Sequence, residues 1–206
     1  MQNDSTQAEI NLPHSPAAER NKSAILEKLK QIFQGDEKVL EIGSGTGQHA
    51  VHFCKAMPGL TWQPTDLPER IPVSNAVIAT ANCNNILKTC ALDASSADWP
   101  DYAADVVYTA NTAHIMPWQI TQTMLRGAAK QLRKGGRLII YGPFKYSGDF
   151  TSESNGLFDA SLKRNNPQQG IRDFEGIERV SKEGGLVLEH DFSMPANNQL
   201  LVFCKQ

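Results

Sequence analysis

The residues of this 206-residue chain that say most about its chemistry are three glycines that alternate with small hydroxyl residues. Glycine has no Cβ and tolerates positive φ, so such a loop lets the backbone come close to a ligand. Residues 39–42 predict a short buried strand before the loop, and residues 48–53 predict a helix after it. Strand, glycine loop and helix open a nucleotide-binding βαβ unit. The loop is Gly43, Ser44, Gly45, Thr46 and Gly47.

The spacing of these glycines narrows the choice of ligand. A dinucleotide-binding fold has the pattern G-x-G-x-x-G, and Gln48 stands where its third glycine would be. This chain has G-x-G-x-G, with Glu41 two residues before the first glycine. The variant resembles motif I of Rossmann-like S-adenosylmethionine-dependent methyltransferases, which implies S-adenosyl-L-methionine as the cofactor. Gln48 disfavours the alternative of a nicotinamide oxidoreductase.

Polar residues follow three further predicted strands. Asp66 follows the strand at 60–65, Asp93 follows the one at 86–92, and Asn111 follows the one at 105–110. Ligands of such sheets bind outside the carboxyl ends of the strands, so these side chains and the glycine loop should converge on one crevice. Asp66 comes about 20 residues after the loop, where a carboxylate can accept both ribose hydroxyls of a nucleoside. Taken singly, each is equally well explained as a turn or cap residue.

The remaining pattern predicts an α/β fold. Ser15-Pro16 begins a helix that runs to about Phe33. Further helices are expected at 72–81, 118–132 and 173–182, and residues 134–136 should form the C-cap of the helix at 118–132. A fifth strand at 137–141 precedes an antiparallel pair at 186–192 and 199–204. We therefore expect a mostly parallel seven-stranded sheet that ends in an antiparallel hairpin, with helices on both faces.

Two segments stand apart from this rhythm. Residues 1–12 are expected to form a loose leader, and residues 13–206 a single domain. The stretch 142–172 is rich in Gly, Ser, Asn and Pro, with a helix-like part only at about 156–164. Long loop-rich inserts are usually functional or disordered, so we expect a lid over the pocket.

Composition excludes several classes of partner. Net charge is −2, and 40% of the residues are hydrophobic, as in a soluble globular protein. We expect no nucleic-acid partner, since the chain lacks a basic stripe with aromatic residues, and no membrane partner, since apolar runs stay short of ~18 residues. Four scattered cysteines without a C-x-x-C pair argue against a metal site and for a cytoplasmic location.

From Ser15 onward the chain resembles an uncharacterised methyltransferase-like family that includes methyltransferase-like protein 26. The resemblance implies a methyltransferase fold and no particular substrate. The segments that carry it are residues 15–21, 39–49, 62–66, 110–115, 141–144, 154–155, 170–173 and 194–198.

The roles usual in related enzymes give a cofactor-binding set. Asp66 would hold the ribose, Asp93 and Ala94 would meet the adenine edge, the glycines would pass under the methionine part, and Asn111 would lie near its amino acid end. Arg20 would bind the methionine carboxylate or, alternatively, an acidic substrate. The full set is Arg20, Glu41, Gly43, Ser44, Gly45, Gly47, His49, Asp66, Leu67, Asp93, Ala94 and Asn111.

His114 is the first candidate for a catalytic residue. It follows the fourth predicted strand on the expected substrate side, and histidine suits proton removal near neutral pH. Tyr141, at the end of the fifth strand, is the second candidate, and a purely structural role remains open for both. The polar lid suggests substrate-binding residues, namely Asn155, Arg172, Asn197 and Asn198.

The predicted activity is methyl transfer to a small polar acceptor. Enzymes that methylate nucleic-acid amino groups carry an Asn/Asp-Pro-Pro-aromatic motif after strand four, and here the segment is Asn111-Thr112-Ala113-His114. The alternative is a non-catalytic module that binds S-adenosylmethionine or a protein partner on the same fold. The sequence determines neither the acceptor nor the oligomeric state.

Overall fold

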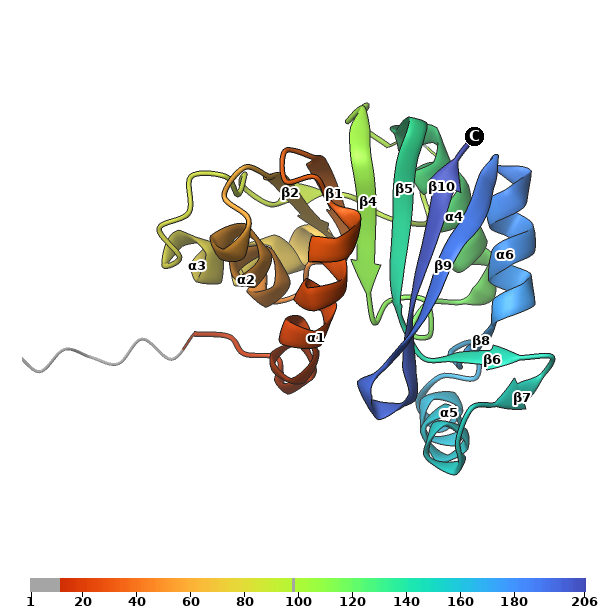
Figure 1. Cartoon of the computed structure of the whole chain (residues 1–206). Helices are drawn as coiled ribbons and strands as arrows, with labels where there is room; N and C mark the ends of the chain where they lie inside the picture. The colour runs from red at the N-terminus through yellow and green to blue at the C-terminus, as the bar shows by residue number, and fades with distance from the viewer. Residues whose placement is uncertain (1–11, 98) are drawn as a thin grey trace, which may run out of the picture.

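The computed structural model describes residues 12–97 and 99–206, and it places one large sheet between two layers of helices (Figure 1). The predicted leader, apart from Leu12, lies outside the described residues. The helices are α1 (Pro16–Ile32), α2 (Gln48–Ala56), α3 (Ile71–Ala79), α4 (Trp118–Gln131), α5 (Glu153–Asn165) and α6 (Phe174–Glu183). The strands of the large sheet are β1 (Lys38–Ile42), β2 (Thr61–Asp66), β3 (Cys90–Ala91), β4 (Ala104–Ala110), β5 (Leu132–Gly142), β9 (Leu186–Met194) and β10 (Asn198–Lys205).

The large sheet has seven strands in the order β3-β2-β1-β4-β5-β10-β9. β1 to β5 pair in parallel, whereas β10 is antiparallel to both β5 and β9. The predicted mostly parallel sheet with an antiparallel C-terminal hairpin is therefore confirmed. The strand order reverses between β1 and β4, which places the ligand-binding crevice of such a sheet at their carboxyl ends.

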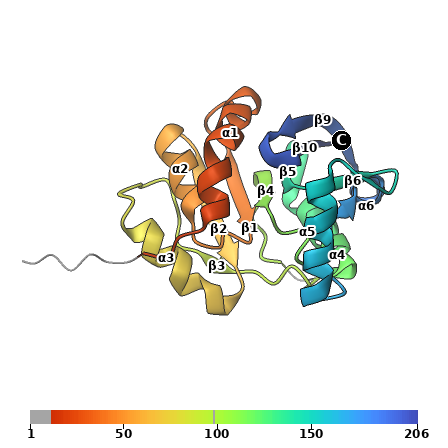
Figure 2. The same ribbon diagram turned by 90° about the horizontal axis from the view of Figure 1, so that it is seen from below.

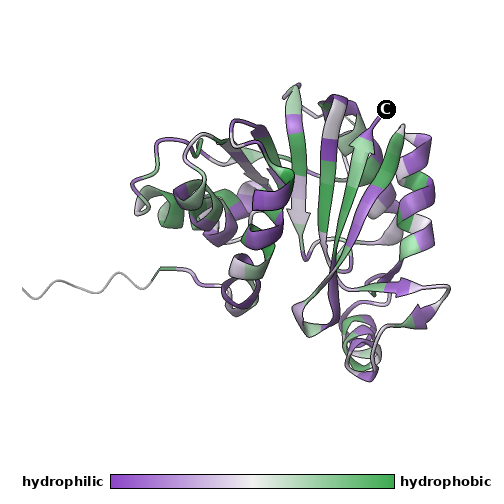
Figure 3. Cartoon of the chain, viewed as in Figure 1, coloured by the Kyte–Doolittle hydropathy of each residue, from purple (hydrophilic) through white to green (hydrophobic). Residues whose placement is uncertain are grey.

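Alternating residues of the central strands pack into two separate hydrophobic cores, one on each face of the sheet. In β4, Val106 and Tyr108 face α1 and α2, and Val107 faces α4 and α6. Figure 3 shows the resulting pattern, with hydrophobic residues concentrated in β5 and β10 and hydrophilic ones on the outer surface of α6. Helices on both faces, as predicted, hold the central strands in place.

Helix α1 forms as its first residues predict. The Ser15 hydroxyl accepts a hydrogen bond from the Ala18 N–H at 3.3 Å, and Pro16 occupies the first helical position. Ile25 and Leu29 are fully buried against the sheet. This packing fixes the start of the helix beside the carboxyl ends of the strands.

The third predicted strand is much shorter than expected, because Pro64 interrupts its ladder. Trp62 in β2 exchanges two 2.9 Å backbone hydrogen bonds with this segment, to Asn85 O and from Leu87 N. Pro64, two residues further, faces the same side and has no N–H to donate. The Gln63 side chain instead donates to Lys88 O at 2.7 Å, and regular pairing resumes only at Cys90 and Ala91.

Two boundaries near α4 and in the insert also differ from the predictions. The expected glycine C-cap after α4 is wrong, since the backbone is already extended at Leu132 and residues 133–136 form an irregular start of β5. The insert is not mainly loop. It contains α5, whose Ser152 N-cap accepts from the Asn155 N–H, and a small sheet of β7 (Asp149–Phe150), β6 (Phe144–Tyr146) and β8 (Arg172–Asp173). Local capping and backbone pairing give order to a stretch whose composition resembles a loop.

Figure 2 looks onto the carboxyl ends of the parallel strands. There α1 and α5 lie on opposite sides of β4. The tip of the β9–β10 hairpin, with the 3-10 helix η2 (Pro195–Asn197), lies at the same end of the sheet. Residues from the first helix, the insert and the last hairpin therefore meet around the ends of β1 and β4.

Candidate active site

The glycine loop is tied to the end of β2 by its own backbone. The N–H groups of Gly43 and Ser44 both donate to Thr65 O at 2.9 Å. Gly43 has a φ of +72°, and a Cβ there would lie 2.8 Å from the Thr112 methyl group, so no other residue fits. A Cβ on Gly45 would meet nothing within 4 Å. The loop thus packs at Gly43 against the turn that follows β4 and leaves open space above Gly45.

That open space belongs to a cavity of about 480 Å³ over the ends of β1, β2 and β4. Leu92, Ile115 and Ile120 add apolar walls that were not among the predicted site residues. Leu92 and Ile115 stand close to predicted strand ends, and Ile120 stands in the helix predicted at 118–132. Ser15, at the start of α1, reaches the same cavity. The sequence-predicted residues that line it are Gly43, Gly45, Asp66, Leu67, Asp93, Ala94 and Asn111.

Asp66 is the most constrained polar group of this cavity, with a relative exposure of 6%. One carboxylate oxygen accepts from the Gly45 N–H at 2.7 Å, and the other accepts from the Leu67 N–H at 2.8 Å. A carboxylate can accept about four hydrogen bonds, so each oxygen keeps capacity for a further donor. The carboxylate is therefore held rigidly while it can still bind two hydroxyl groups.

Asp93 sits at the opposite, exposed edge of the cavity. Its Oδ1 accepts from the hydroxyl and the backbone N–H of Ser95, at 2.7 and 2.8 Å, and these two bonds lower its pKa. The neighbouring Ala94 is buried and lines the same wall. This edge presents a charged rim beside a small apolar surface.

Glu41, Ser44 and Gly47 lie beneath the cavity and do not line it. Glu41 is 2% exposed, and its Oε2 accepts from the Trp62 indole N–H and the Ser44 hydroxyl, both at 2.9 Å. Burial raises the pKa of Glu41 to about 7, against the effect of these two hydrogen bonds. Gly47 begins α2 with a φ of +75°. These residues set the shape of the loop.

A second cavity, of about 690 Å³, adjoins the first, and Asn111 lines both. Asn111 has a φ of +58°, which asparagine tolerates better than most residues, and its N–H donates to Tyr141 O at 2.9 Å. This bend at the end of β4 separates the two spaces. The sequence-predicted residues around the second cavity are Arg20, Asn111, His114, Tyr141, Asn155 and Asn198.

His114 is the buried imidazole of the second cavity, with a relative exposure of 6%. Its ring meets the ring of Phe158 from α5 edge-on, at 5.4 Å between centroids. Burial, and to a lesser extent the charge of Arg172, lowers the pKa of His114 to about 4. The imidazole is therefore neutral at pH 7 and has a lone pair that can accept a proton.

Arg172 lies outside both cavities. Its guanidinium donates to the backbone carbonyls of Ala113 and Gln168, at 2.9 and 3.0 Å, and also to that of Met116. These bonds fasten the turn that carries His114 to the insert. The sequence placed Arg172 in the correct region, but only the fold shows that backbone carbonyls occupy its donors.

The predicted asparagines join the insert to the C-terminal hairpin. Asn155 donates through its amide to Thr151 Oγ1 and Asn197 O, both at 2.9 Å. Asn198 donates to Pro195 O at 3.0 Å, and its side chain lines the second cavity. Asn197 lies outside this cavity and donates to Ser154 Oγ at 3.3 Å. Together these bonds close one wall of the second cavity.

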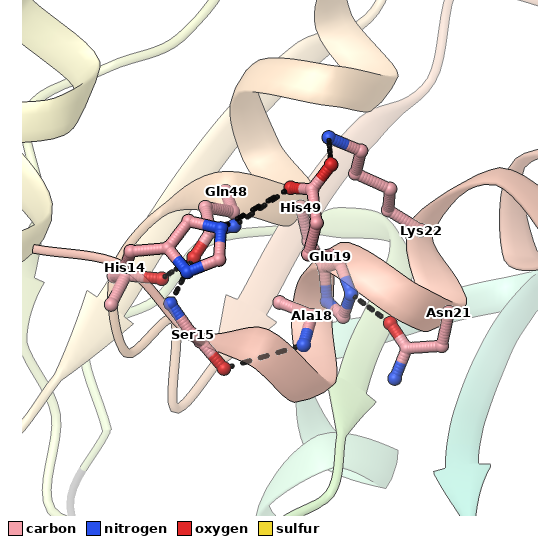
Figure 4. Close-up of polar contacts among 9 residues, drawn as sticks. His14, Ser15, Ala18, Glu19, Asn21, Lys22, Gln48 and His49 are labelled. Carbon is pink, nitrogen blue, oxygen red and sulfur yellow. Dashed lines mark hydrogen bonds and ion pairs between the residues drawn. The ribbon is translucent and has the colours of Figure 1, made fainter.

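His49 also lies outside both cavities, although the sequence suggested a cofactor contact. It lies in the first turn of α2 and is buried, and its ring stacks on Phe53 at 5.3 Å between centroids. One ring nitrogen contacts Asn21 and the other contacts Tyr108. Figure 4 shows His49 beneath the first turns of α1, where Gln48 also reaches Ser15 and Glu19.

Residues 12–97 and 99–206 contain no group of three or more His, Cys, Asp or Glu side chains that could hold a metal ion. The same residues contain no helix that combines the length and apolarity of a membrane span.

The fold is that of the class I methyltransferases, as comparison with solved structures shows. The S-adenosylmethionine-dependent methyltransferase SibL, in its apo form, is 21% identical with a TM-score of 0.77 over 92% of this chain and 55% of SibL. An O-methyltransferase family protein from Burkholderia thailandensis is 18% identical with a TM-score of 0.76 over 90% of this chain and 58% of that protein. PigF with SAH is 16% identical, with a TM-score of 0.78 over 91% of this chain and 56% of PigF. This chain thus spans little more than half the length of these proteins.

Residues 12–205 match the model of a family described as "Protein of unknown function (DUF938)". The match covers almost the whole chain, so the chain belongs to this family.

Proposed function

We propose that this protein transfers a methyl group from S-adenosyl-L-methionine to a small polar acceptor. The observation that carries the proposal is the pair of adjoining cavities that share Asn111. One has a glycine loop and a doubly held carboxylate, and the other has a buried neutral imidazole. The S-adenosylmethionine-dependent methyltransferases among proteins of the same fold support the same reading.

The residues of the first cavity fit this cofactor. Asp66 would accept hydrogen bonds from the two ribose hydroxyls, since each of its oxygens keeps a free lone pair. The apolar wall that includes Ala94 and Ile120 would take the adenine ring, with Asp93 at its edge. The open space above Gly45 would take the methionine part. When bound, the cofactor supplies a methyl group on a sulfonium sulfur.

The second cavity would hold the acceptor. Methyl transfer is an in-line displacement, so the protein mainly has to orient the acceptor atom and exclude water. An acceptor that must lose a proton would give it to His114, which is neutral at pH 7. Tyr141, 3% exposed, would donate a hydrogen bond to the acceptor. Asn155 and Asn198 would line the wall opposite α1, and Arg172 would act indirectly, by positioning the His114 turn.

The size of the second cavity favours a small molecule over a macromolecule. At about 690 Å³ it suits a metabolite of modest size, and α1, α5 and the hairpin surround it. The net charge of −2 offers no attraction for nucleic acid. We also propose that the chain is related to the methyltransferase-like family that includes methyltransferase-like protein 26, which the segments between residues 15 and 198 resemble.

Calorimetric titration with S-adenosylmethionine, S-adenosylhomocysteine and NAD tests the cofactor. We expect both sulfur nucleosides to bind and NAD to bind more weakly; no binding of the nucleosides, or tighter binding of NAD, would overturn the proposal. Incubation with methyl-labelled cofactor and small-molecule extract then tests catalysis. Label should appear in an extract compound with the native protein and not with heat-denatured protein.

A further inference from the structure

The wall of the second cavity that α1 forms contains a residue without an assigned role. Arg20 and Asn21 both line this wall, Arg20 exposed and Asn21 buried with a relative exposure of 9%. A buried amide must have its hydrogen bonds satisfied, so the orientation of Asn21 is set by its neighbours. Those neighbours lie on α2 and β4.

His49 and Tyr108 determine which way the Asn21 amide points. Asn21 Oδ1 lies 2.7 Å from His49 Nε2, and an amide oxygen only accepts, so His49 Nε2 carries the proton. Burial lowers the pKa of His49 to about 4, so Nδ1 is unprotonated at pH 7 and accepts from the Tyr108 hydroxyl at 3.3 Å. Tyr108 is fully buried and meets the His49 ring edge-on. The chain of donors therefore has one direction.

The amide nitrogen of Asn21 consequently faces away from His49, as Figure 4 shows. It lies near the Tyr141 hydroxyl on the cavity wall, where it lowers the pKa of that hydroxyl against the effect of burial, and its N–H groups can donate to a ligand. Asn155 and Asn198 differ, since both donate through their amide nitrogens to neighbouring protein oxygens. Asn21 is thus an oriented donor on this wall.

The charge of the cavity points to the same kind of ligand group. Of the described residues that line it, Arg20 alone carries a charge at pH 7, because His114 is neutral. A guanidinium and an adjacent amide N–H together offer donors and positive charge and no carboxylate to oppose an anion. Arg20 adds the charge, and Asn21 adds a fixed direction.

We propose that Arg20 and Asn21 form a carboxylate subsite of the second cavity, with Asn21 held as a donor by His49 and Tyr108. The inference rests on the proposed function for its biological meaning. The carboxylate belongs to the acceptor or to the methionine end of the cofactor, which would lie near Asn111, the residue that lines both cavities. Both sources present the same chemistry to the two side chains.

Binding measurements on Arg20→Gln and Asn21→Asp separate the two sources. Arg20→Gln removes a charge from an exposed side chain, and Asn21→Asp keeps the oxygen toward His49 while it replaces the cavity-facing N–H by an acceptor. The nucleoside probes are S-adenosylhomocysteine and 5′-methylthioadenosine, which lacks the amino acid part. The acceptor probes are benzoate and the uncharged benzamide, added to the protein saturated with S-adenosylhomocysteine and followed by NMR chemical shifts.

Loss of one hydrogen bond to a charged group should lower the affinity for the carboxylate by about 10- to 100-fold in each variant. If the carboxylate is that of the cofactor, S-adenosylhomocysteine loses this affinity in both variants and 5′-methylthioadenosine does not. If it is that of the acceptor, benzoate loses affinity, and benzamide and both nucleosides do not. Either pattern supports the subsite.

The subsite is refuted if both variants bind all probes as the native protein does, or if the two nucleosides weaken equally. The subsite is also refuted if the native protein binds benzoate and benzamide with equal affinity and neither variant changes the affinity for the nucleosides. A native protein that binds neither nucleoside refutes the proposed function instead, and the benzoate titration of the free protein then still tests the subsite.

Two further variants keep the test independent of folding. Arg164→Gln, on the exposed last turn of α5, is the matched charge control and should leave every affinity unchanged. His49→Phe keeps a ring against Phe53 but releases the Asn21 amide, so it should weaken carboxylate binding less than Asn21→Asp does. Circular dichroism confirms that each variant is folded before it is titrated.

Discussion

Replacement of Asp66 by alanine gives the sharpest test of the first cavity. In the free protein the change removes the acceptor of two backbone N–H groups, those of Gly45 and Leu67, at 2.7 and 2.8 Å. Water can reach these donors through the cavity and replace the carboxylate, so we expect a loss of stability of about 1–3 kcal/mol, the net worth of two hydrogen bonds. Denaturant unfolding would measure it.

The effect on ligand binding has a magnitude of its own. Two ribose hydroxyls would lose a charged acceptor, which corresponds to roughly 1.5–3 kcal/mol, or about 10- to 150-fold in Kd for S-adenosylhomocysteine. The 2′-deoxy analogue lacks one of these hydroxyls, so its Kd should change by about half as much in free energy. Calorimetric titration of both ligands against the native and Asp66→Ala proteins gives the comparison.

Two results would refute this reasoning about Asp66. Equal losses for the two ligands would mean that the carboxylate does not touch the ribose and serves only the turn at the end of β2. An unchanged Kd for both would remove Asp66 from the site altogether. Asp36→Ala, an exposed carboxylate far along the chain from β2, is the control and should change neither Kd.

Four further substitutions test other parts of the site. Gly45→Val should abolish S-adenosylhomocysteine binding in calorimetry but leave the protein folded, since the side chain would enter the open space at a φ of +57°; native affinity would refute the cradle. His114→Ala should keep cofactor affinity and reduce methyl transfer by about 100-fold once an acceptor is found; loss of cofactor binding as well would reassign His114 to the cofactor. Folding lowers the pKa of His114 from 6.5 to about 4, so between these pH values the unfolded chain binds a proton that the folded protein does not. The free energy of unfolding should therefore decrease as pH falls from 6.5 to about 4, and His114→Phe should flatten that part of the stability profile. Folding raises the pKa of Glu41 from 4.5 to about 7, so protonation of Glu41 stabilises the folded protein as pH falls through this range. Glu41→Gln removes this gain but can still accept from Trp62 and Ser44, so the stability of this variant should fall more steeply with decreasing pH.

The first cavity is the part of this protein that local sequence predicts best. Gly43, Asp66, Asp93 and Asn111 each follow a predicted strand, and Gly45 belongs to the loop after the first of them. Parallel strands bring their carboxyl ends to one edge, so residues directly after such strands must lie close together. The mostly parallel sheet was predictable from the alternation of strands and helices, and the antiparallel hairpin from two strands joined by a short turn.

Some local features were misread because the decisive partner lies elsewhere in the chain. The short β3 depends on the missing N–H of Pro64 in the neighbouring strand, and the order of the insert depends on pairing between β6 and β8, which are separated by α5. Arg172 reads as a free cation, yet carbonyls of another segment occupy its donors. Composition describes a segment alone and carries no information about its partner.

The sequence by itself determined the kind of loop, the acids at the strand ends and the α/β class, since these depend on backbone rules that act over a few residues. Only the tertiary structure decided that Asn111 divides two cavities, that burial leaves His114 neutral, and that His49 serves Asn21 instead of a ligand. Each of these depends on desolvation or on contacts between α1, α2, β4 and the insert. Such contacts join residues far apart in the chain, and they exist only once the two cores on either side of the sheet have packed.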